Sequence, residues 1–156
     1  MKSRKLIDKS PFKTTLYRWV INSFMPYVGA GIKVDSISAD FRAIDVSMKL
    51  RWYNRNYVGT HFGGSLYAMT DPFLMLMVIQ NLGKDYIVWD KAASIEFVKP
   101  GTGRMQVQFR LSETELNNIR QSAEQGKVLP EFNLEIRDEM QNLVAIVHKT
   151  LYVKKK

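Results

Sequence analysis

One segment restricts the fold of this chain more than any other, the near-continuous apolar stretch 65–82 between Gly64 and Gly83. Its length and its Leu and Met content favour a helix over a strand. Because the stretch is apolar on every side, the helix should be buried on every side. A curved antiparallel β-sheet wrapped around a long central helix would bury most of it, so the sequence predicts an α+β fold of that kind. One flank would stay open, and a second subunit is its natural cover.

The flanking segments supply the strands and the smaller helices. A first helix is predicted to begin after Ser10, at Pro11, and to end at Pro26. Ser112 and Glu115 have the spacing of a capping box, which predicts a short helix closed by Gly126. The strands are predicted from apolar runs, most of them alternating, at 32–34, 44–52, 86–90, 93–98, 105–111, 132–137 and 143–153.

The length of 156 residues fits one domain, which we assign to 1–156. Within it, 1–27 forms an N-terminal helical extension and about 28–153 form the core. No cysteine is present, which excludes disulfides and thiolate chemistry and makes the cytoplasm the expected compartment.

The formal net charge of +8 is concentrated at the two ends of the chain. Residues 1–18 contain six Lys or Arg against one Asp, and 149–156 contain four Lys and no acid. A nucleic-acid groove would need this charge on one folded face, so we interpret both ends as solvated tails and expect no nucleic-acid partner.

A membrane partner is not expected either. The segment 1–25 is broken by polar residues such as Thr14, Arg18 and Asn22, and no cleavage site follows it. The apolar stretch 66–82 contains Asp71-Pro72 and is too short for a spanning helix.

The unusual residues gather in the window 54–72. Gly63-Gly64 directly precede the central helix, where backbone N–H groups can approach a ligand and the helix dipole favours negative charge. These are the requirements of an oxyanion hole that polarises a carbonyl group. The alternative is that the two glycines only shape the loop.

Asp71 lies among apolar residues, where an unpaired carboxylate is costly. It could be a desolvated carboxylate with a raised pKa, suited to activating water or to attacking a substrate. Followed by Pro72, it could equally be the N-cap of a helix that restarts there. The residues alone leave both readings open. His61 has no second histidine or cysteine nearby, so no metal site is expected.

The pattern Asn56-x-x-Gly59-Thr60-x-x-Gly63-Gly64, with Asp71 eight residues after Gly63, resembles the phenylacetate-type acyl-CoA thioesterases of the hotdog superfamily. The resemblance covers about 28–153 and is closest to an uncharacterised subfamily in which Thr-His-Phe-Gly-Gly and Asp-Pro occur together. It implies a hotdog fold, paired into homodimers or homotetramers, and hydrolysis of acyl thioesters with no cofactor beyond the CoA of the substrate.

The resemblance also implies roles for single residues. Asp71 would be the nucleophile or general base and would reach across the dimer interface. Asn56 would hold the attacking water or the substrate, and the N–H of Gly64, with that of Gly63, would bind the thioester oxygen. We add the loop residues His61 and Phe62, and Lys99, to the substrate-binding set; Lys99 could reach a CoA phosphate or could simply stay solvated.

The sequence departs from the family pattern at two positions. The histidine that usually precedes Gly-Gly is Phe62 here, with His61 displaced by one position, and Pro72 interrupts the helix directly after the acid. These departures favour an alternative function, a non-catalytic binding protein for acyl-CoA or fatty acids. A hydroxyacyl-thioester dehydratase is disfavoured, because its acid lies fourteen residues after the histidine, and Met75 occupies that position here.

Overall fold

The computed structural model describes residues 11–156, with side chains from Thr14 onward. Ser10, the expected cap of the first helix, lies outside the described residues. The sheet has the strand order β1-β2-β4-β5-β6-β3, and all of its strand pairs are antiparallel. Its strands are β1 (Ile32–Ile37), β2 (Ala43–Lys49), β3 (Tyr86–Phe97), β4 (Arg104–Arg110), β5 (Glu131–Arg137) and β6 (Leu143–Lys155). The helices are α1 (Pro11–Asn22), α2 (Met25–Ala30), α3 (Gly63–Ala68), α4 (Phe73–Leu82) and α5 (Glu113–Glu124).

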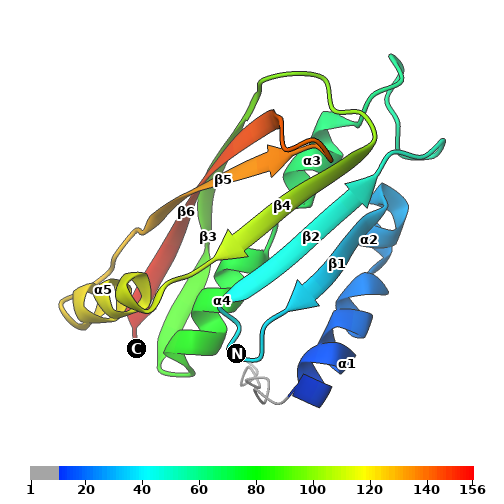
Figure 1. Ribbon diagram of the computed structural model, residues 1–156. Helices are drawn as coiled ribbons and strands as arrows, with labels where there is room; N and C mark the ends of the chain where they lie inside the picture. The colour runs from blue at the N-terminus through cyan, green and yellow to red at the C-terminus, as the bar shows by residue number, and fades with distance from the viewer. Residues whose placement is uncertain (1–10) are drawn as a thin grey trace.

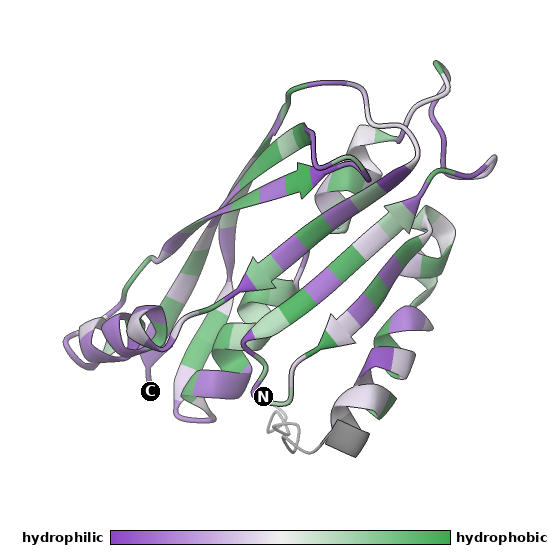
Figure 2. Ribbon diagram, viewed as in Figure 1, coloured by the Kyte–Doolittle hydropathy of each residue, from purple (hydrophilic) through white to green (hydrophobic). Residues whose placement is uncertain are grey.

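The sheet curves around α3 and α4, which lie along its inner face (Figure 1). Hydrophobic and hydrophilic residues alternate along β2 and β4 (Figure 2), as expected when one face of each strand meets a helix and the other meets water. The α4 side chains at the centre of this core are almost completely buried: Phe73, Leu74, Met77 and Val78. The predicted α+β architecture, with a central helix wrapped by an antiparallel sheet, is confirmed. Within residues 11–156, no helix is long and apolar enough to cross a membrane.

The central helix is divided in two. The stretch predicted to form one helix over 65–82 forms α3 and α4, with Met69–Pro72 between them. Proline cannot donate to the preceding turn, and it disfavours a helical conformation in the residue before it, here Asp71. The break therefore follows from the Asp71-Pro72 pair, whose peptide bond is cis.

The N-terminal helical region continues beyond the expected end at 27. Pro26 lies in the first turn of α2, where a missing N–H is tolerated, and the region extends to Ala30. The polar side of α1 faces the edge strand β1. The side-chain amide of Asn22 donates to the carbonyl of Val34 (3.1 Å) and accepts from its N–H (2.7 Å). Helix α1 thus occupies hydrogen-bonding groups of β1 that a further strand would otherwise use.

The opposite edge of the sheet is β3, which pairs only with β6 among the described strands. The two strands predicted at 86–90 and 93–98 are one strand with an irregularity between Asp90 and Ala92. Residues 91–94 in its middle are exposed. The helix predicted after Ser112 is confirmed as α5, and both hydrogen bonds of the Ser112–Glu115 capping box are present.

Candidate functional site

Asp71 lies in the turn between α3 and α4 and forms an ion pair with a buried lysine. The Nζ of Lys149, on β6, is 2.7 Å from Asp71 Oδ1 and 2.9 Å from Oδ1 of Asp90, on β3. The side chain of Lys149 is only 1% exposed, whereas that of Asp71 is 45% exposed in the single chain. One buried cation therefore links two carboxyl groups that the sequence separates widely.

The charges of this cluster influence one another. Burial opposes the charge of Lys149, but its hydrogen bonds to Asp71 and Asp90 outweigh burial and raise the lysine pKa. Burial raises the pKa of Asp90, the Asp71 carboxylate adds to that increase, and Lys149 only partly offsets it. Two acids beside one cation cannot both be fully compensated, so a proton is held more readily on Asp90 than on an exposed aspartate.

Neither of the two readings left open for Asp71 describes its environment. Its carboxylate is paired rather than isolated in an apolar setting, and α4 has no side-chain cap hydrogen bond, with Pro72 at the N-cap position. The Tyr27 hydroxyl, from α2, donates to the backbone carbonyl of Asp71. The Tyr67 ring lies 5.7 Å from Lys149 Nζ. The helix break and the buried lysine together place the free part of the carboxylate toward solvent.

Asn56 uses its side-chain amide within its own loop. Its Oδ1 accepts from the N–H groups of Val58 and Thr60, and its Nδ2 donates to the Thr60 hydroxyl at 2.8 Å. The carbonyl of His61 is a further acceptor, at 3.3 Å. These bonds fix the shape of the loop that leads into α3.

His61 is 2% exposed and joins this loop to the turn before β4. Its Nε2 lies 3.0 Å from the carbonyl of Gly103, and its backbone N–H donates to Gly101. Burial lowers the pKa of His61 below its ordinary value, and the Gly103 bond only partly offsets that effect. A neutral ring that donates from Nε2 satisfies this geometry, while the buried Nδ1 has no hydrogen-bond partner.

Gly63 and Gly64 open α3, and each is covered by an aromatic ring. A Cβ added at Gly63 would lie 2.9 Å from the Phe97 ring, and one at Gly64 would lie 2.5 Å from the Phe62 ring. Both contacts are with the tips of exposed rings, so a side chain at either position would require the ring to move aside. The first N–H groups of a helix have no acceptor within it. Any ligand atom bound by the Gly64 amide would approach beside the ring of Phe62.

A cavity of about 340 Å³ lies next to this loop. Its lining is mostly apolar and includes Leu66, Phe97, Val98 and Pro100, together with Asn56 and Lys99.

Lys99 is not simply solvated, because its Nζ is 2.7 Å from Asp138 Oδ2. This ion pair holds the pKa of Asp138 well below its ordinary value. A second hollow of about 360 Å³, between α2 and the loop, includes Asn56, Phe62 and Ser65.

Within one chain, Asp71 and Gly64 do not belong to the same part of this site. Gly64 lies in the first turn of α3, whereas Asp71 lies beyond the last residue of that helix, Ala68, in the turn that leads to α4. Among the residues with described side chains, no group of three or more His, Cys, Asp or Glu is placed to hold a metal ion. The structure thus brings His61, Phe62, Gly63, Lys99 and Asn56 to the loop and cavity, and Asp71 to the Lys149 cluster.

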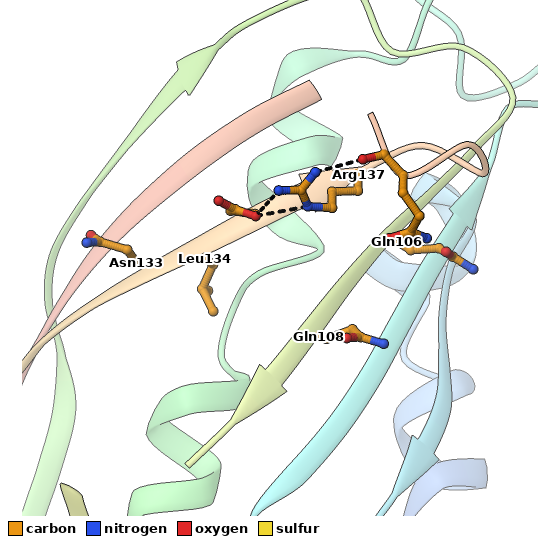
Figure 3. A pocket seen from close by; sticks show the side chains of 7 residues that line it. Gln106, Gln108, Asn133, Leu134 and Arg137 are labelled. Atoms are coloured by element: carbon orange, nitrogen blue, oxygen red, sulfur yellow. Dashed lines mark hydrogen bonds and ion pairs between the residues drawn. The ribbon is translucent and has the colours of Figure 1, made fainter. Parts of the chain in front are cut away.

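The outer face of the sheet carries a separate polar hollow of about 280 Å³, between β4 and β5 (Figure 3). These two strands pair only at Gln106–Arg137 and Val107–Ile136 and then diverge. Arg137 binds Glu135 and the carbonyl of Gln141, so its donors are used within the hollow. This hollow lies on the face of the sheet opposite the helices and the glycine loop.

Sequence reasoning missed Lys149 and Asp90. Lys149 was counted among the residues of a solvated basic tail, but it lies on the inner face of β6. Its position in the alternating run 143–153, with Val147, Leu151 and Val153 on the same buried face, is the signal that could have identified it.

The comparisons with known proteins agree with this geometry. Residues 13–153 match the family described as a domain of unknown function (DUF4442). Among curated proteins, none has a sequence that matches this chain significantly. A Pseudomonas aeruginosa structure described as a "probable thioesterase" has a TM-score of 0.81 and 18% identity, covering 92% of this chain and 96% of its own.

Two further solved structures have the same fold. The thioesterase HI1161 of Haemophilus influenzae has a TM-score of 0.67 and 16% identity, covering 96% of this chain and 95% of its own. The PaaI protein of the Escherichia coli phenylacetic acid degradation operon has a TM-score of 0.62 and 14% identity, covering 97% and 96%. These likenesses confirm the hotdog fold expected from the sequence. The chain has that fold and belongs to the DUF4442 family, a domain of unknown function.

Proposed function

We propose that this protein hydrolyses acyl thioesters, with CoA as part of the substrate. The observation that carries the proposal is the Asp71 carboxylate, which is held by the buried Lys149 and still 45% exposed. An anchored carboxylate with one face open to solvent is suited to orienting and deprotonating water. The apolar cavity beside Gly63 has the size and lining for an acyl group.

In this proposal Asp71 acts as general base. Its carboxylate takes a proton from water as the water oxygen bonds to the thioester carbonyl carbon. The carbonyl oxygen becomes an oxyanion, which the N–H of Gly64 stabilises. The tetrahedral intermediate then collapses, the carbon–sulfur bond breaks, and the thiolate leaves with its electron pair. The thiolate takes up the proton that Asp71 holds, which restores the carboxylate. Lys149 is a positioning residue that holds the Asp71 carboxylate in place.

We propose that two subunits share the site, because Gly64 opens α3 and Asp71 of the same chain lies beyond the other end of that helix. We propose that the β3 edges of two copies pair, since the middle of β3 is exposed and carries the small residues Ala92, Ala93 and Ser94. Asp90 lies on the same strand, so the acid cluster would adjoin that interface. Asp71 of one subunit would then face the Gly64 amide of the other.

The decisive experiment replaces Asp71 with Asn. Turnover of a panel of acyl-CoA thioesters should fall at least about a hundredfold, the lower range for removing an acid–base group. The matched control is Asp45→Asn, because Asp45 also pairs with a cation, Arg110, but on the other side of the fold from the cluster. Wild-type turnover in Asp71→Asn would remove this residue from the mechanism.

Subunit mixing tests whether the site is shared. Gly64→Pro removes the proposed oxyanion donor in the first turn of α3, where proline is tolerated once the Phe62 ring moves aside, and its unfolding midpoint should match that of the wild type. Neither Gly64→Pro nor Asp71→Asn should turn over substrate alone. Refolded together in equal amounts, they should recover about a quarter of the wild-type activity, because half of the dimers carry one intact site. No recovery in correctly folded mixed dimers would contradict a shared site.

A non-catalytic acyl-thioester binding protein is the second candidate. It is favoured by the Phe62 ring, which lies over Gly64, and by the Asn56 amide, which is committed to its own loop. This alternative predicts acyl-CoA binding without turnover in the wild type, with an affinity unchanged in Asp71→Asn. Phe62→Ala separates the two, since it should raise turnover only if a catalytic Gly64 amide lies beneath the ring.

A further inference from the structure

Helix α1 is oriented with its apolar side outward. Its buried or half-buried side carries Thr14, Tyr17, Arg18, Ile21 and Asn22, whereas Leu16, Trp19 and Val20 are exposed. The same exposed surface continues onto α2. We call these residues the α1–α2 stripe, and they are between 47% and 73% exposed: Leu16, Trp19, Val20, Phe24, Met25 and Val28.

Hydrogen bonds and the packing of Tyr17 and Ile21 together fix this orientation. Asn22 bonds both backbone groups of Val34, and the Arg18 Nη1 donates to the carbonyl of Asp35 at 2.6 Å. Rotation of α1 to bury the α1–α2 stripe would break these bonds and leave the groups of an edge strand unpaired. Exposed apolar residues that are gathered on one side and held there indicate an interaction surface.

Pairing through β3 would not cover the stripe. Strand β1, beside which α1 lies, is at one end of the strand order, and β3 is at the other (Figure 1). The stripe therefore needs a different partner.

Charge favours an anionic partner over a second copy. No Asp or Glu occurs between Asp8 and Asp35, while this segment contains Lys9, Lys13, Arg18 and Lys33. Two such segments facing each other would bring cations together without any carboxylate. An amphipathic helix with Trp, Phe and Leu on one side and basic residues nearby is suited to an anionic lipid surface.

We propose that the α1–α2 stripe lies in the headgroup region of an anionic lipid membrane. The proposal is independent of catalysis at Asp71. It replaces the sequence-based expectation of no membrane partner, which rested on the lack of a spanning helix and of a leader peptide. Helix α1 has 12 residues and is about 18 Å long, so it would lie along the membrane surface and not cross a core about 30 Å thick.

Vesicle sedimentation tests the proposal with the full-length protein. Vesicles of equal parts phosphatidylcholine and phosphatidylglycerol should bind the protein, and binding should weaken as salt screens the charges. Pure phosphatidylcholine should bind it at least about tenfold more weakly, because the electrostatic attraction is absent. Equal binding to both, or binding to neither, would overturn the proposal.

Paired variants locate the contact. Trp19→Ser/Phe24→Ser should lower binding to the anionic vesicles about tenfold or more, since both rings leave the interface. Met140→Ser is the matched control, because Met140 is 84% exposed in the turn between β5 and β6. Unfolding midpoints of the variants should match that of the wild type, which excludes misfolding. An unchanged affinity in a folded double variant would contradict the proposal.

Trp19 can report its own environment. With Trp52→Phe and Trp89→Phe, Trp19 is the single tryptophan, and its emission should shift to shorter wavelength on anionic vesicles. The competing occupant, a second copy of the chain, has a different signature. It would give a blue-shifted emission without lipid, and sedimentation would show smaller assemblies for Trp19→Ser/Phe24→Ser. That result would overturn membrane docking.

Discussion

Helices α4 and α1 both contain large apolar residues. In α4 these side chains point toward the sheet, and in α1 many of them point toward solvent. In α4, Phe73 and Met77 are completely buried under the sheet. In α1, Trp19 and Val20 are exposed, and the polar side contacts the sheet. Apolar periodicity predicts both helices, but it does not determine whether the apolar side meets the protein interior. The polar contacts of a helix determine which of its sides meets the protein interior, and in α1 the Asn22 side chain makes such contacts.

The largest expected difference between the two helices is in the stability of the fold. Phe73→Ala should lower the free energy of unfolding by about 3–5 kcal/mol, because Phe73 is completely buried and packs against Tyr27 and Phe109. Trp19→Ala should change it by less than about 0.5 kcal/mol. Urea unfolding of both variants measures the contrast. A large loss in Trp19→Ala would show that the stripe is packed against protein in solution.

Substitution of a buried lysine should likewise cost more folding stability than substitution of an exposed lysine. Lys149→Met leaves Asp71 and Asp90 without their cation, at a cost of about 3 kcal/mol near neutral pH. Lys155→Met breaks only an exposed pair with Glu124 and should cost less than about 1 kcal/mol.

Urea unfolding at several pH values provides a further check on Lys149→Met. Its cost should shrink as the pH falls, because the unpaired carboxyl groups then take up protons. A cost that does not depend on pH would mean that packing, and not charge, explains it.

The attachment of α1 should depend on its polar side. Asn22→Ala should lower the free energy of unfolding by about 1–3 kcal/mol, because the N–H and carbonyl of Val34 lose their partner. Val20→Ala, two positions away on the exposed side, should stay within about 0.5 kcal/mol. Equal effects of the two substitutions would contradict the orientation of the helix.

The smallest expected effect is the contribution of His61 to the pH dependence of folding stability. His61 has a lowered pKa in the folded protein, so the unfolded chain binds more protons in mild acid. Its contribution to stability is therefore complete above the unfolded pKa of about 6.5 and is lost as the pH falls below it, by at most about 1.4 kcal/mol per pH unit. His61→Gln should flatten this dependence. Vesicle binding should not change over the same window, because 11–30 contain no acidic residue or histidine.

Local signals predicted the elements that depend on neighbours in sequence. The Ser112–Glu115 capping box and the strand alternation predicted α5 and most of the observed strands, because each depends on backbone bonding or periodicity within a few residues. The apolar central stretch predicted one helix, which the structure divides into α3 and α4. The family pattern around Gly63-Gly64 and Asp71 led to the fold as a whole.

The features that the sequence did not predict depend on contacts between residues that are distant in the chain. Lys149 lies 78 positions from Asp71, and no local pattern reports that pairing. Asn56 and His61 were given ligand-binding roles by the family pattern, and their hydrogen bonds within the loop became visible only with the turn at 101–103 in place. The orientation of α1 could not be predicted for the same reason, since backbone groups of β1 bind the polar side chains that orient the helix.

The asymmetry between the two edges of the sheet has a consequence for how far assembly can proceed. Strands exposed at both edges could recruit copies end after end, as in a fibre. Here Asn22 occupies backbone groups of β1, and β3 alone is left exposed. Association through a single self-complementary edge closes after two copies. If the copies pair as proposed, one asparagine side chain would thus block the second edge and limit this association to two copies.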